Sequence, residues 1–474
     1  MQQDLDPDLA LDWHSAPRPD GGVLYRDLPT RREAARDLGG IVHALPGAVL
    51  RPAGGRDIAH LLSWASLRGV PASAAGTRHQ MGGQASPGEG GLIIDTRSLS
   101  EIYDLQDDHI TVGAGTTLRQ ITEAASARGL RTISGSTGYT RLTVGGVCSA
   151  GGITSTYRTG ALIDSVEELE VVTAAGEIHT CTAEDNAELF NAALAGGGRG
   201  GIITRVRLAL THAPSRVRTW TLHYTQDPEQ TRVMLADMRM LADRGEVDEL
   251  WVQWLRDEQV DHTTYRMHVS SYYTGPEPDP QVLLQDLHRE PAEVTDETWG
   301  AHAIRHDALY DTIMPEWAAR PKAWSCYFLP ESELAQWCDR TAAELDETDY
   351  GTPLSQGLMF PHKRTAFARP GLHLPEPTGD PNELVVLWGV LLETSNDTPA
   401  EQWLPPRMGR ARRWVDHLHT LGGTVYPIGS DPVTPDDAPT TDSTDDLMAT
   451  HDPHQILSGP YAGRVATHLA RRHN

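Results

Sequence analysis

The chain has 474 residues, enough for two packed domains with a site between them. Its 40 Lys and Arg face 65 Asp and Glu, and the formal net charge of −25 disfavours nucleic acid and anionic membrane as partners. No apolar run approaches the roughly 20 residues that span a bilayer, and the acidic start at residues 1–4 is unlike a signal peptide. We therefore expect a cytoplasmic protein.

The four cysteines are scattered and form no CxxC pair, so the sequence indicates neither a metal site nor a disulfide framework. We expect buried free thiols. These cysteines are Cys148, Cys181, Cys326 and Cys338.

The first third of the chain alternates strand and helix patterns. A short helix is predicted around 30–45, and a βαβ unit follows with a strand at 48–52, a helix at 57–67 and a strand at 70–74. A glycine-rich loop occupies 76–91. Beyond it, we predict strands at 92–95, 110–113, 168–173 and 202–210 and helices at 117–128 and 187–195.

The pattern changes after Pro214. Long polar alternations at 219–224 and 266–273, with helices near 229–244 and 331–347, predict a second domain built on an antiparallel sheet. The Asp-, Thr- and Pro-rich stretch at 432–445 is predicted to be a mobile loop. We divide the chain into a first domain at 1–212 with its core at 45–212, a second at 213–420, and a C-terminal segment at 421–474 that returns to the first.

Three glycine-rich runs, at 75–84, 142–153 and 196–204, carry the functional signal. Glycines allow backbone N–H groups to turn inward around a pyrophosphate and let the chain lie against a large planar ligand. Tight structural turns would explain the glycines alone, but not the lone His79 among them. None of the runs is a GxGxxG that opens a helix or a GxxxxGK[ST], so Rossmann and P-loop folds lose their main support.

The order of these runs, followed by further motifs at 164–173, 186–190 and 201–205, resembles the vanillyl-alcohol oxidase and p-cresol methylhydroxylase superfamily of FAD-linked oxidoreductases, and within it the cytokinin dehydrogenases. The similarity is dense over 50–212 and returns near 320–330 and 452–458. It implies an α+β fold: a p-cresol methylhydroxylase-type FAD-binding domain with two α/β subdomains, and a substrate domain whose antiparallel sheet is flanked by helices.

The resemblance implies FAD as the cofactor, held by a bond from His79 to the 8α-methyl group. The alternative is a noncovalent histidine in the pocket. A second, cysteinyl link is not expected, because Tyr139 stands at that position and Cys148 lies beyond it. The other FAD contacts carried over are Gly76, Thr77, Arg78, Gln80, Gln84, Thr143, Gly146, Ser149, Ile153, Ile203 and Ser458.

The catalytic positions depart from the cytokinin dehydrogenases. Gly138 stands where they have the aspartate that accepts the amine proton, and their supporting glutamate falls near Trp251. Authentic cytokinin oxidation is therefore not expected. Our catalytic candidates are Tyr139, His306 and Tyr310, and our substrate-binding candidates are Trp251 and Gln253; for each, ordinary packing is the alternative.

The leading hypothesis is an oxidase that transfers a hydride from a small organic substrate to FAD and passes the electrons to O2. Natural products are one candidate substrate class. The alternatives are a dehydrogenase with a quinone or another acceptor, and a flavin-retaining cyclase or eliminase without net redox change. The protein is expected to be a monomer or a homodimer.

Overall fold

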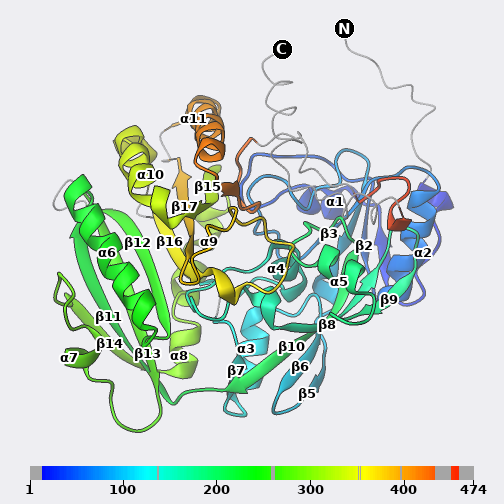
Figure 1. Ribbon diagram of the computed structural model, residues 1–474. Coiled ribbons are helices and arrows are strands. Elements are labelled where there is room, and N and C mark those ends of the chain that lie inside the picture. The colour runs from blue at the N-terminus through cyan, green and yellow to red at the C-terminus, as the bar shows by residue number, and fades with distance from the viewer. Residues whose placement is uncertain are drawn as a thin grey trace.

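The computed structural model describes residues 13–135, 138–257, 262–350, 352, 354–394, 398–432 and 450–457 (Figure 1). Three β-sheets and their covering helices account for most of these residues. The two smaller sheets lie on one side of the molecule and the largest lies on the other, as Figure 1 shows. The predicted α+β class is confirmed.

The first sheet contains the predicted βαβ unit. Its order is β1 (Val23–Tyr25), β2 (Ala48–Arg51), β4 (Leu92–Asp95), β3 (Ala72–Ala75). Strands β2 and β3 both run parallel to β4, with α2 (Gly55–Ser66) connecting β2 to β3. Parallel strands need such a crossover, and the apolar face of α2 is buried against the sheet.

The helix predicted at 30–45 was wrong in extent, because α1 (Leu28–Ala34) ends eleven residues earlier. After α1 the backbone N–H groups bond to another segment of the chain and not within a helix. The N–H groups of Leu38 and Gly39 donate to the carbonyls of Arg78 and Gln80, so this stretch runs along the first glycine loop instead of bonding to itself. A Cβ at Gly39 would stand 1.9 Å from the Met81 carbonyl oxygen, which shows how close the two chains are.

The second sheet is antiparallel, and its helices pack around one apolar core. Its order is β5 (Ile102–Leu105), β6 (His109–Gly113), β10 (Ile202–His212), β8 (Val166–Val172), β9 (Ile178–Cys181), and β7 (Leu130–Thr132) pairs with β10. The associated helices are α3 (Leu118–Ser126), α4 (Val144–Ala150) and α5 (Ala187–Ala193).

The third sheet has eight strands and is antiparallel throughout, as predicted for the second half of the chain. Its order is β14 (Glu293–Thr298), β11 (Arg216–Thr225), β13 (His262–Tyr273), β12 (Glu249–Asp257), β16 (Gln356–Lys363), β17 (Leu384–Glu393), β15 (Lys322–Pro330), β18 (Thr424–Val425). The helices of this half are α6 (Pro228–Arg244), α7 (Pro280–Leu283), α8 (Trp299–Ala303), α9 (Asp307–Trp317), α10 (Glu331–Glu344) and α11 (Ala400–Thr420).

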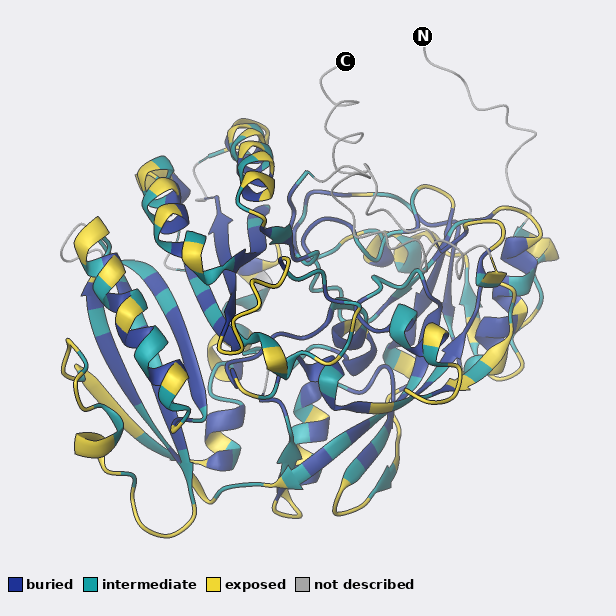
Figure 2. Ribbon diagram, viewed as in Figure 1, coloured by how far each residue is buried: buried dark blue, intermediate teal, exposed yellow. Residues whose placement is uncertain are grey.

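Alternation along these strands separates a core face from a cavity face. Leu250, Val252 and Trp254 of β12 are buried with α6, α10 and α11 in one hydrophobic cluster. Trp251 and Gln253, the intervening residues, face the opposite side and line a cavity. Figure 2 shows the same contrast, with buried inner faces and exposed outer faces on the covering helices. Because strand side chains alternate, one strand supplies both the core and the cavity wall.

The C-terminal residues contact both halves. Strand β18 extends the third sheet beside β15, whereas Ile456 accepts a hydrogen bond from the N–H of Ala72 in β3. The boundaries proposed at 212/213 and 420/421 stay a prediction. Ser458 and residues 433–445 of the predicted mobile loop lie outside the described residues. No helix within the described ranges is long and apolar enough to cross a membrane.

Candidate active site

A cavity of about 520 Å³ lies between the first two sheets and the cavity face of the third. Small-molecule and cofactor sites typically enclose about 300–1,000 Å³. Of the predicted cofactor, catalytic and substrate residues, all except the undescribed Ser458 line this cavity. The structure thus brings together residues from Gly76 to Tyr310, more than 230 positions apart in the chain.

The loop after β3 forms one wall, and two neighbouring segments, around residues 37–38 and 429, hold it in place. Arg78 adopts a positive φ of 57°, and its carbonyl accepts from Leu38. The Gly83 N–H donates to Asp37 at 2.7 Å, and the Gln84 side chain donates to the Gly429 carbonyl at 2.6 Å. Because Gln84 also accepts from the N–H of Gly82, its amide fixes the loop to the C-terminal segment.

His79 lies in the centre of this fixed loop. Burial, with a smaller contribution from the positive charge of Lys322, lowers the pKa of His79 to about 4. The imidazole is therefore neutral near pH 7, and one ring nitrogen keeps a free electron pair for bonding. Lys322 is itself buried, and its ammonium group donates to the Leu38 carbonyl at 3.0 Å and to the Arg320 carbonyl at 2.7 Å.

Bare glycine backbone forms the adjoining wall. A Cβ at Gly76 would stand 1.9 Å from Thr143 Oγ1. The loop after β3 and the segment before α4 therefore lie too close together for a side chain at position 76. Gly138 and Gly198 instead face open space, since an added Cβ would meet nothing within 4 Å. A planar ring or a pyrophosphate fits such a surface, because peptide N–H groups can be approached closely there.

An aromatic chain connects this loop to α9. The rings of His79 and Tyr139 are 4.8 Å apart, those of Tyr139 and Tyr310 are 4.9 Å apart, and Tyr310 continues to Trp317 at 5.5 Å. Burial, with the nearby charge of Asp311, raises the pKa of Tyr139 to about 12. Tyr139 therefore stays protonated near pH 7 and can donate a hydrogen bond, but it is a poor general base.

The third sheet supplies an aromatic wall with a polar pair. Trp251 stacks on Phe360 with ring centroids 5.9 Å apart, and the edge of His306 meets its ring at 6.2 Å. Gln253 donates to the Gln356 side-chain oxygen at 2.5 Å. This wall suits a flat, largely apolar ligand with at least one group that can hydrogen-bond.

Among the described residues that line the cavity there is no Asp or Glu. Two carboxylates lie behind the wall. Asp307 accepts from the Thr140 N–H at 3.0 Å and from Arg119 at 3.1 Å, which fixes the turn that carries Tyr139. Glu249 is buried against His302 and Arg305.

His306 is a second neutral imidazole in the lining of the cavity. It caps the N-terminus of α9, and Tyr310 follows one turn later, so both side chains reach the cavity from the same helix. Burial, together with the positive charge of Arg305, lowers the pKa of His306 to about 4. An imidazole that is uncharged at neutral pH can take a proton from a hydroxyl or an amine.

Sequence reasoning missed several residues that line the same cavity. Gln356 and Phe360 lie on β16, which was not predicted as a strand, and Trp317 ends α9. The sequence of β16 gives no alternating signal, because Leu358, Met359 and Phe360 are consecutive apolar residues and Pro361 follows them; the alternation is visible only in the burial of the strand. Cys148, by contrast, is buried in the core with a pKa raised to about 12 by burial, in agreement with the prediction of a packed thiol.

Comparison with known proteins identifies the first half of the chain. A family described as FAD binding domain matches residues 46–182. An uncharacterized oxidoreductase from the fasciation locus of Rhodococcoides fascians is 26% identical over 424 residues, covering 88% of this chain and 92% of that protein. Cytokinin dehydrogenase 2 of Arabidopsis thaliana is 35% identical over 226 residues, 46% of this chain and 45% of the relative. This match thus spans less than half of either protein.

Two solved structures share the fold over nearly the whole chain. The 6-hydroxy-D-nicotine oxidase of Arthrobacter nicotinovorans superposes with a TM-score of 0.69 at 17% identity, covering 94% of this chain and 98% of that one. The xylooligosaccharide oxidase of Myceliophthora thermophila gives 0.72 at 16% identity, with coverage of 95% and 98%.

These findings, with the cavity between the glycine loops and the third sheet, define the class. The chain is an FAD-binding oxidoreductase: its residues 46–182 match the FAD binding domain family, and two solved oxidases share its fold.

Proposed function

We propose that the protein is an oxidase that transfers a hydride from a carbon of a small, neutral, largely apolar substrate to FAD linked covalently through His79, with O2 as the final electron acceptor. The observation that carries this proposal is the cavity itself. One wall is bare backbone with His79 among its lining residues, and the opposite wall is aromatic with one neutral imidazole.

The glycine wall offers open backbone against which FAD can lie. Gly138 and Gly198 leave room over the backbone, and no described acidic side chain lines the cavity to repel the pyrophosphate. Bound FAD would supply the hydride acceptor. The residues we expect to hold it are those carried over from the family pattern, with the loop at 76–84 and the wall at 143–153 as the main contacts.

The covalent link is supported by the state of His79. Its imidazole is uncharged near pH 7, and the carbonyls on both sides of it are held by Leu38 and Gly39, so the ring is presented from a fixed backbone. A nitrogen that forms a bond to carbon must be unprotonated and correctly placed.

Proton transfer is assigned to His306. When a hydride leaves the carbon of an alcohol, the hydroxyl proton needs an acceptor. Tyr139 keeps its own proton, whereas His306 is neutral, so we assign Tyr139 and Tyr310 to substrate orientation and His306 to proton acceptance. Trp251 and Gln253 are assigned to substrate binding.

The lack of a carboxylate among the described residues that line the cavity separates this site from one built for a cationic amine. Gly138, which stands at the expected aspartate position, has no side chain and a φ of 83°, and none of the described lining residues is acidic. A cationic substrate would have no counter-charge there, and its desolvation would be uncompensated. We therefore propose a neutral substrate and not a cytokinin-type amine oxidation.

Two other functions use the same cavity: a dehydrogenase with a quinone acceptor, and a flavin-retaining cyclase. Stoichiometric H2O2 in air would support the oxidase over both. A product of unchanged oxidation state would identify the cyclase.

The first experiment is an absorbance spectrum before and after acid precipitation of the wild type, His79→Ala and His306→Ala. We expect flavin to stay in the pellet of the wild type and of His306→Ala, and to be released or absent in His79→Ala. Release from the wild type would contradict the covalent link, and no flavin in any preparation would contradict the whole proposal.

A further inference from the structure

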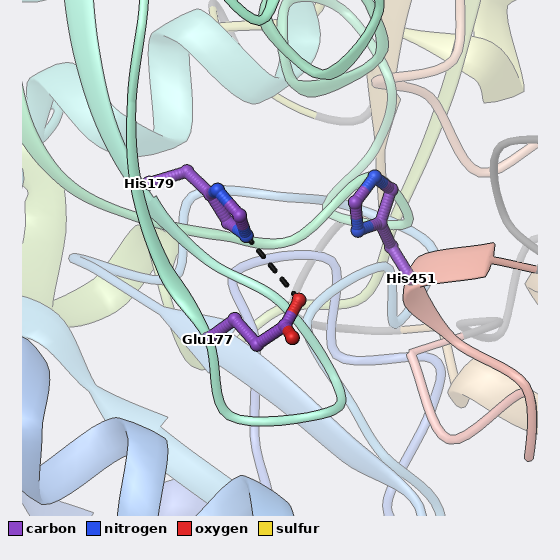
Figure 3. Close-up of side chains that lie close together, drawn as sticks. All are labelled: Glu177, His179 and His451. Atoms are coloured by element: carbon purple, nitrogen blue, oxygen red, sulfur yellow. Dashed lines mark hydrogen bonds and ion pairs between the residues drawn. The ribbon is translucent and has the colours of Figure 1, made fainter.

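Three potential metal ligands converge at the edge of the second sheet, within the FAD-binding half of the chain. Glu177 lies in the turn between β8 and β9, His179 lies on the edge strand β9, and His451 belongs to the C-terminal segment 450–457 (Figure 3). One ligand atom from each lies within 4.8 Å of the other two. Within the described ranges, this is the one group of three or more His, Cys, Asp or Glu residues that is so arranged.

The pair on the hairpin already has a spacing that a metal ion requires. His179 Nε2 and Glu177 Oε2 are 3.4 Å apart. Zinc bonds to nitrogen and oxygen of about 2.0–2.2 Å in a tetrahedron place neighbouring ligand atoms roughly 3.3 Å apart. The widest separation in the cluster must therefore close by up to about 1.5 Å, and Glu177 is exposed and can adjust its rotamer.

The ion pair between Glu177 and His179 does not account for the position of His451. Its Nδ1 is buried and has no hydrogen-bond partner. Leaving a buried polar atom unsatisfied costs about 1–3 kcal/mol. The rings of His179 and His451 meet edge to face at 74° with centroids 5.8 Å apart, and Figure 3 shows a ring nitrogen of His451 turned toward the other two side chains.

A second carboxylate lies near the cluster. Glu188, in the first turn of α5, acts electrostatically on His451 as Glu177 does. Two imidazoles and one carboxylate are a ligand set typical of zinc and related first-row transition metals, and the fourth position of the tetrahedron can be filled by water.

We propose that Glu177, His179 and His451 form a zinc site that cross-links the C-terminal segment to the β8–β9 hairpin. Five residues after His451, Ile456 bonds to β3, and the next residue, Leu457, lines the cavity. Asp452 accepts from the N–H groups of Ile456 and Leu457 at 2.8 and 2.7 Å, so the segment is compact between the ion and the cavity wall. Zinc therefore stabilises the part of the cavity wall that this segment forms.

The binding test uses zinc chloride and chelator-treated full-length protein in equilibrium dialysis, with metal content measured by mass spectrometry. We expect one zinc per chain in the wild type, and binding weakened at least tenfold in His451→Ala and, separately, in His179→Ala, because loss of a ligand exceeds the roughly 10–100-fold effect of losing an outer-shell partner. His60→Ala, which removes an exposed histidine on α2 outside the cluster, is the matched control and should bind like the wild type. Equal zinc binding by all four proteins, or none by the wild type, would overturn the proposal.

The cross-link can be tested separately by hydrogen exchange, a measurement that does not depend on flavin chemistry. Hydrogen exchange of the amides in 450–457 should slow when zinc is added to the wild type and to His60→Ala, and should not change in His179→Ala. His179 is distant in sequence from the segment that is measured, so this variant reports on the link and not on a local change. Exchange that is insensitive to zinc in the wild type would refute the cross-link.

Discussion

The two walls of the cavity are built in different ways. The cofactor wall, at residues 76–84 and 143–153, is shaped by backbone: a Cβ added at Gly76 would stand only 1.9 Å from Thr143 Oγ1. The substrate wall is shaped by side chains of the long strands β12 and β16, where alternate residues face the cavity. A backbone wall tolerates almost no substitution, whereas a side-chain wall can change its chemistry residue by residue. The cofactor can therefore be predicted from sequence motifs, whereas the substrate cannot.

The largest expected effect comes from adding one methyl group to the backbone wall. In Gly76→Ala the new Cβ would overlap Thr143 Oγ1 at 1.9 Å, and the loop that carries His79 would have to move. We expect loss of most bound flavin, measured as the ratio of flavin to protein absorbance after purification.

Gly54→Ala is the matched control. Gly54 precedes α2 with an extended backbone, φ −179°, and a Cβ there meets nothing within 4 Å. Flavin content should equal that of the wild type. If both variants kept their flavin, the backbone wall would be more tolerant than the contacts indicate.

The next effect tests the neutral imidazole on the opposite wall. His306→Gln keeps a polar side chain but removes the basic nitrogen, so the rate of flavin reduction by an oxidisable substrate should fall by about 10²–10⁴-fold, the usual contribution of general base catalysis. Anaerobic stopped-flow absorbance measures this rate.

Flavin content of His306→Gln should stay at the wild-type level, because the change is confined to the substrate wall. His223→Gln, on β11 of the same sheet but not among the described residues that line the cavity, should reduce its flavin at the wild-type rate. An undiminished rate in His306→Gln would assign proton transfer to another group.

The contrast between the backbone wall and the side-chain wall also explains which parts of the fold and of the site could be predicted from the sequence. The βαβ unit and the antiparallel third sheet followed from the strand and helix patterns, and the cavity position of His79 followed from the glycine loops together with the family resemblance. Helix α4 did not, because Val144–Ala150 contains two glycines and two valines, which have low helix propensity; tertiary contacts, including those of Gly145 with Ala114, decide its conformation. Helix α11 was missed because Pro405 and Pro406 lie inside it.

In the substrate wall, the side-chain contacts depend on the pairing of strands β12 and β16, which no local sequence pattern predicts. Gln253 meets Gln356 across β12 and β16, 103 positions apart, and Trp251 meets Phe360 in the same way. The role of Asp307 as the partner of Thr140 likewise depends on tertiary packing. These residues could be named only once strand order was known.

A third prediction concerns the buried charges behind the substrate wall. The Glu249 carboxylate lies 3.1 Å from His302 Nε2 and 3.3 Å from Arg305, and it accepts a hydrogen bond from Tyr272. Glu249→Gln leaves the buried His302 and the partly exposed Arg305 without their anionic partner. We expect a loss of about 3–5 kcal/mol in the free energy of unfolding, measured with urea.

This loss should depend on pH. Burial raises the pKa of Glu249, but the charges of His302 and Arg305 outweigh burial, so this pKa lies well below 4.5. Burial lowers the pKa of His302, but its interaction with Glu249 outweighs burial, so this pKa lies above 6.5. The stabilisation from Glu249 is lost as pH falls below 4.5, and that from His302 is lost as pH rises through its raised pKa. The difference between wild type and variant should therefore be larger at pH 5.5 than at pH 8.5; a difference that grew with pH would contradict the charge assignment.

The smallest effect tests the polar pair of the substrate wall. Gln253→Leu keeps the size of the side chain but removes its hydrogen bond to Gln356, so an alcohol-bearing substrate should lose a few-fold in affinity, about the 0.5–1.5 kcal/mol of one hydrogen bond. KM should rise while the rate of flavin reduction at saturation changes little. Gln281→Leu, on the exposed helix α7, should change neither. A fall in the saturated rate with constant KM would instead place Gln253 next to the reacting atoms, and would make this wall part of the catalytic machinery rather than a surface for recognition alone.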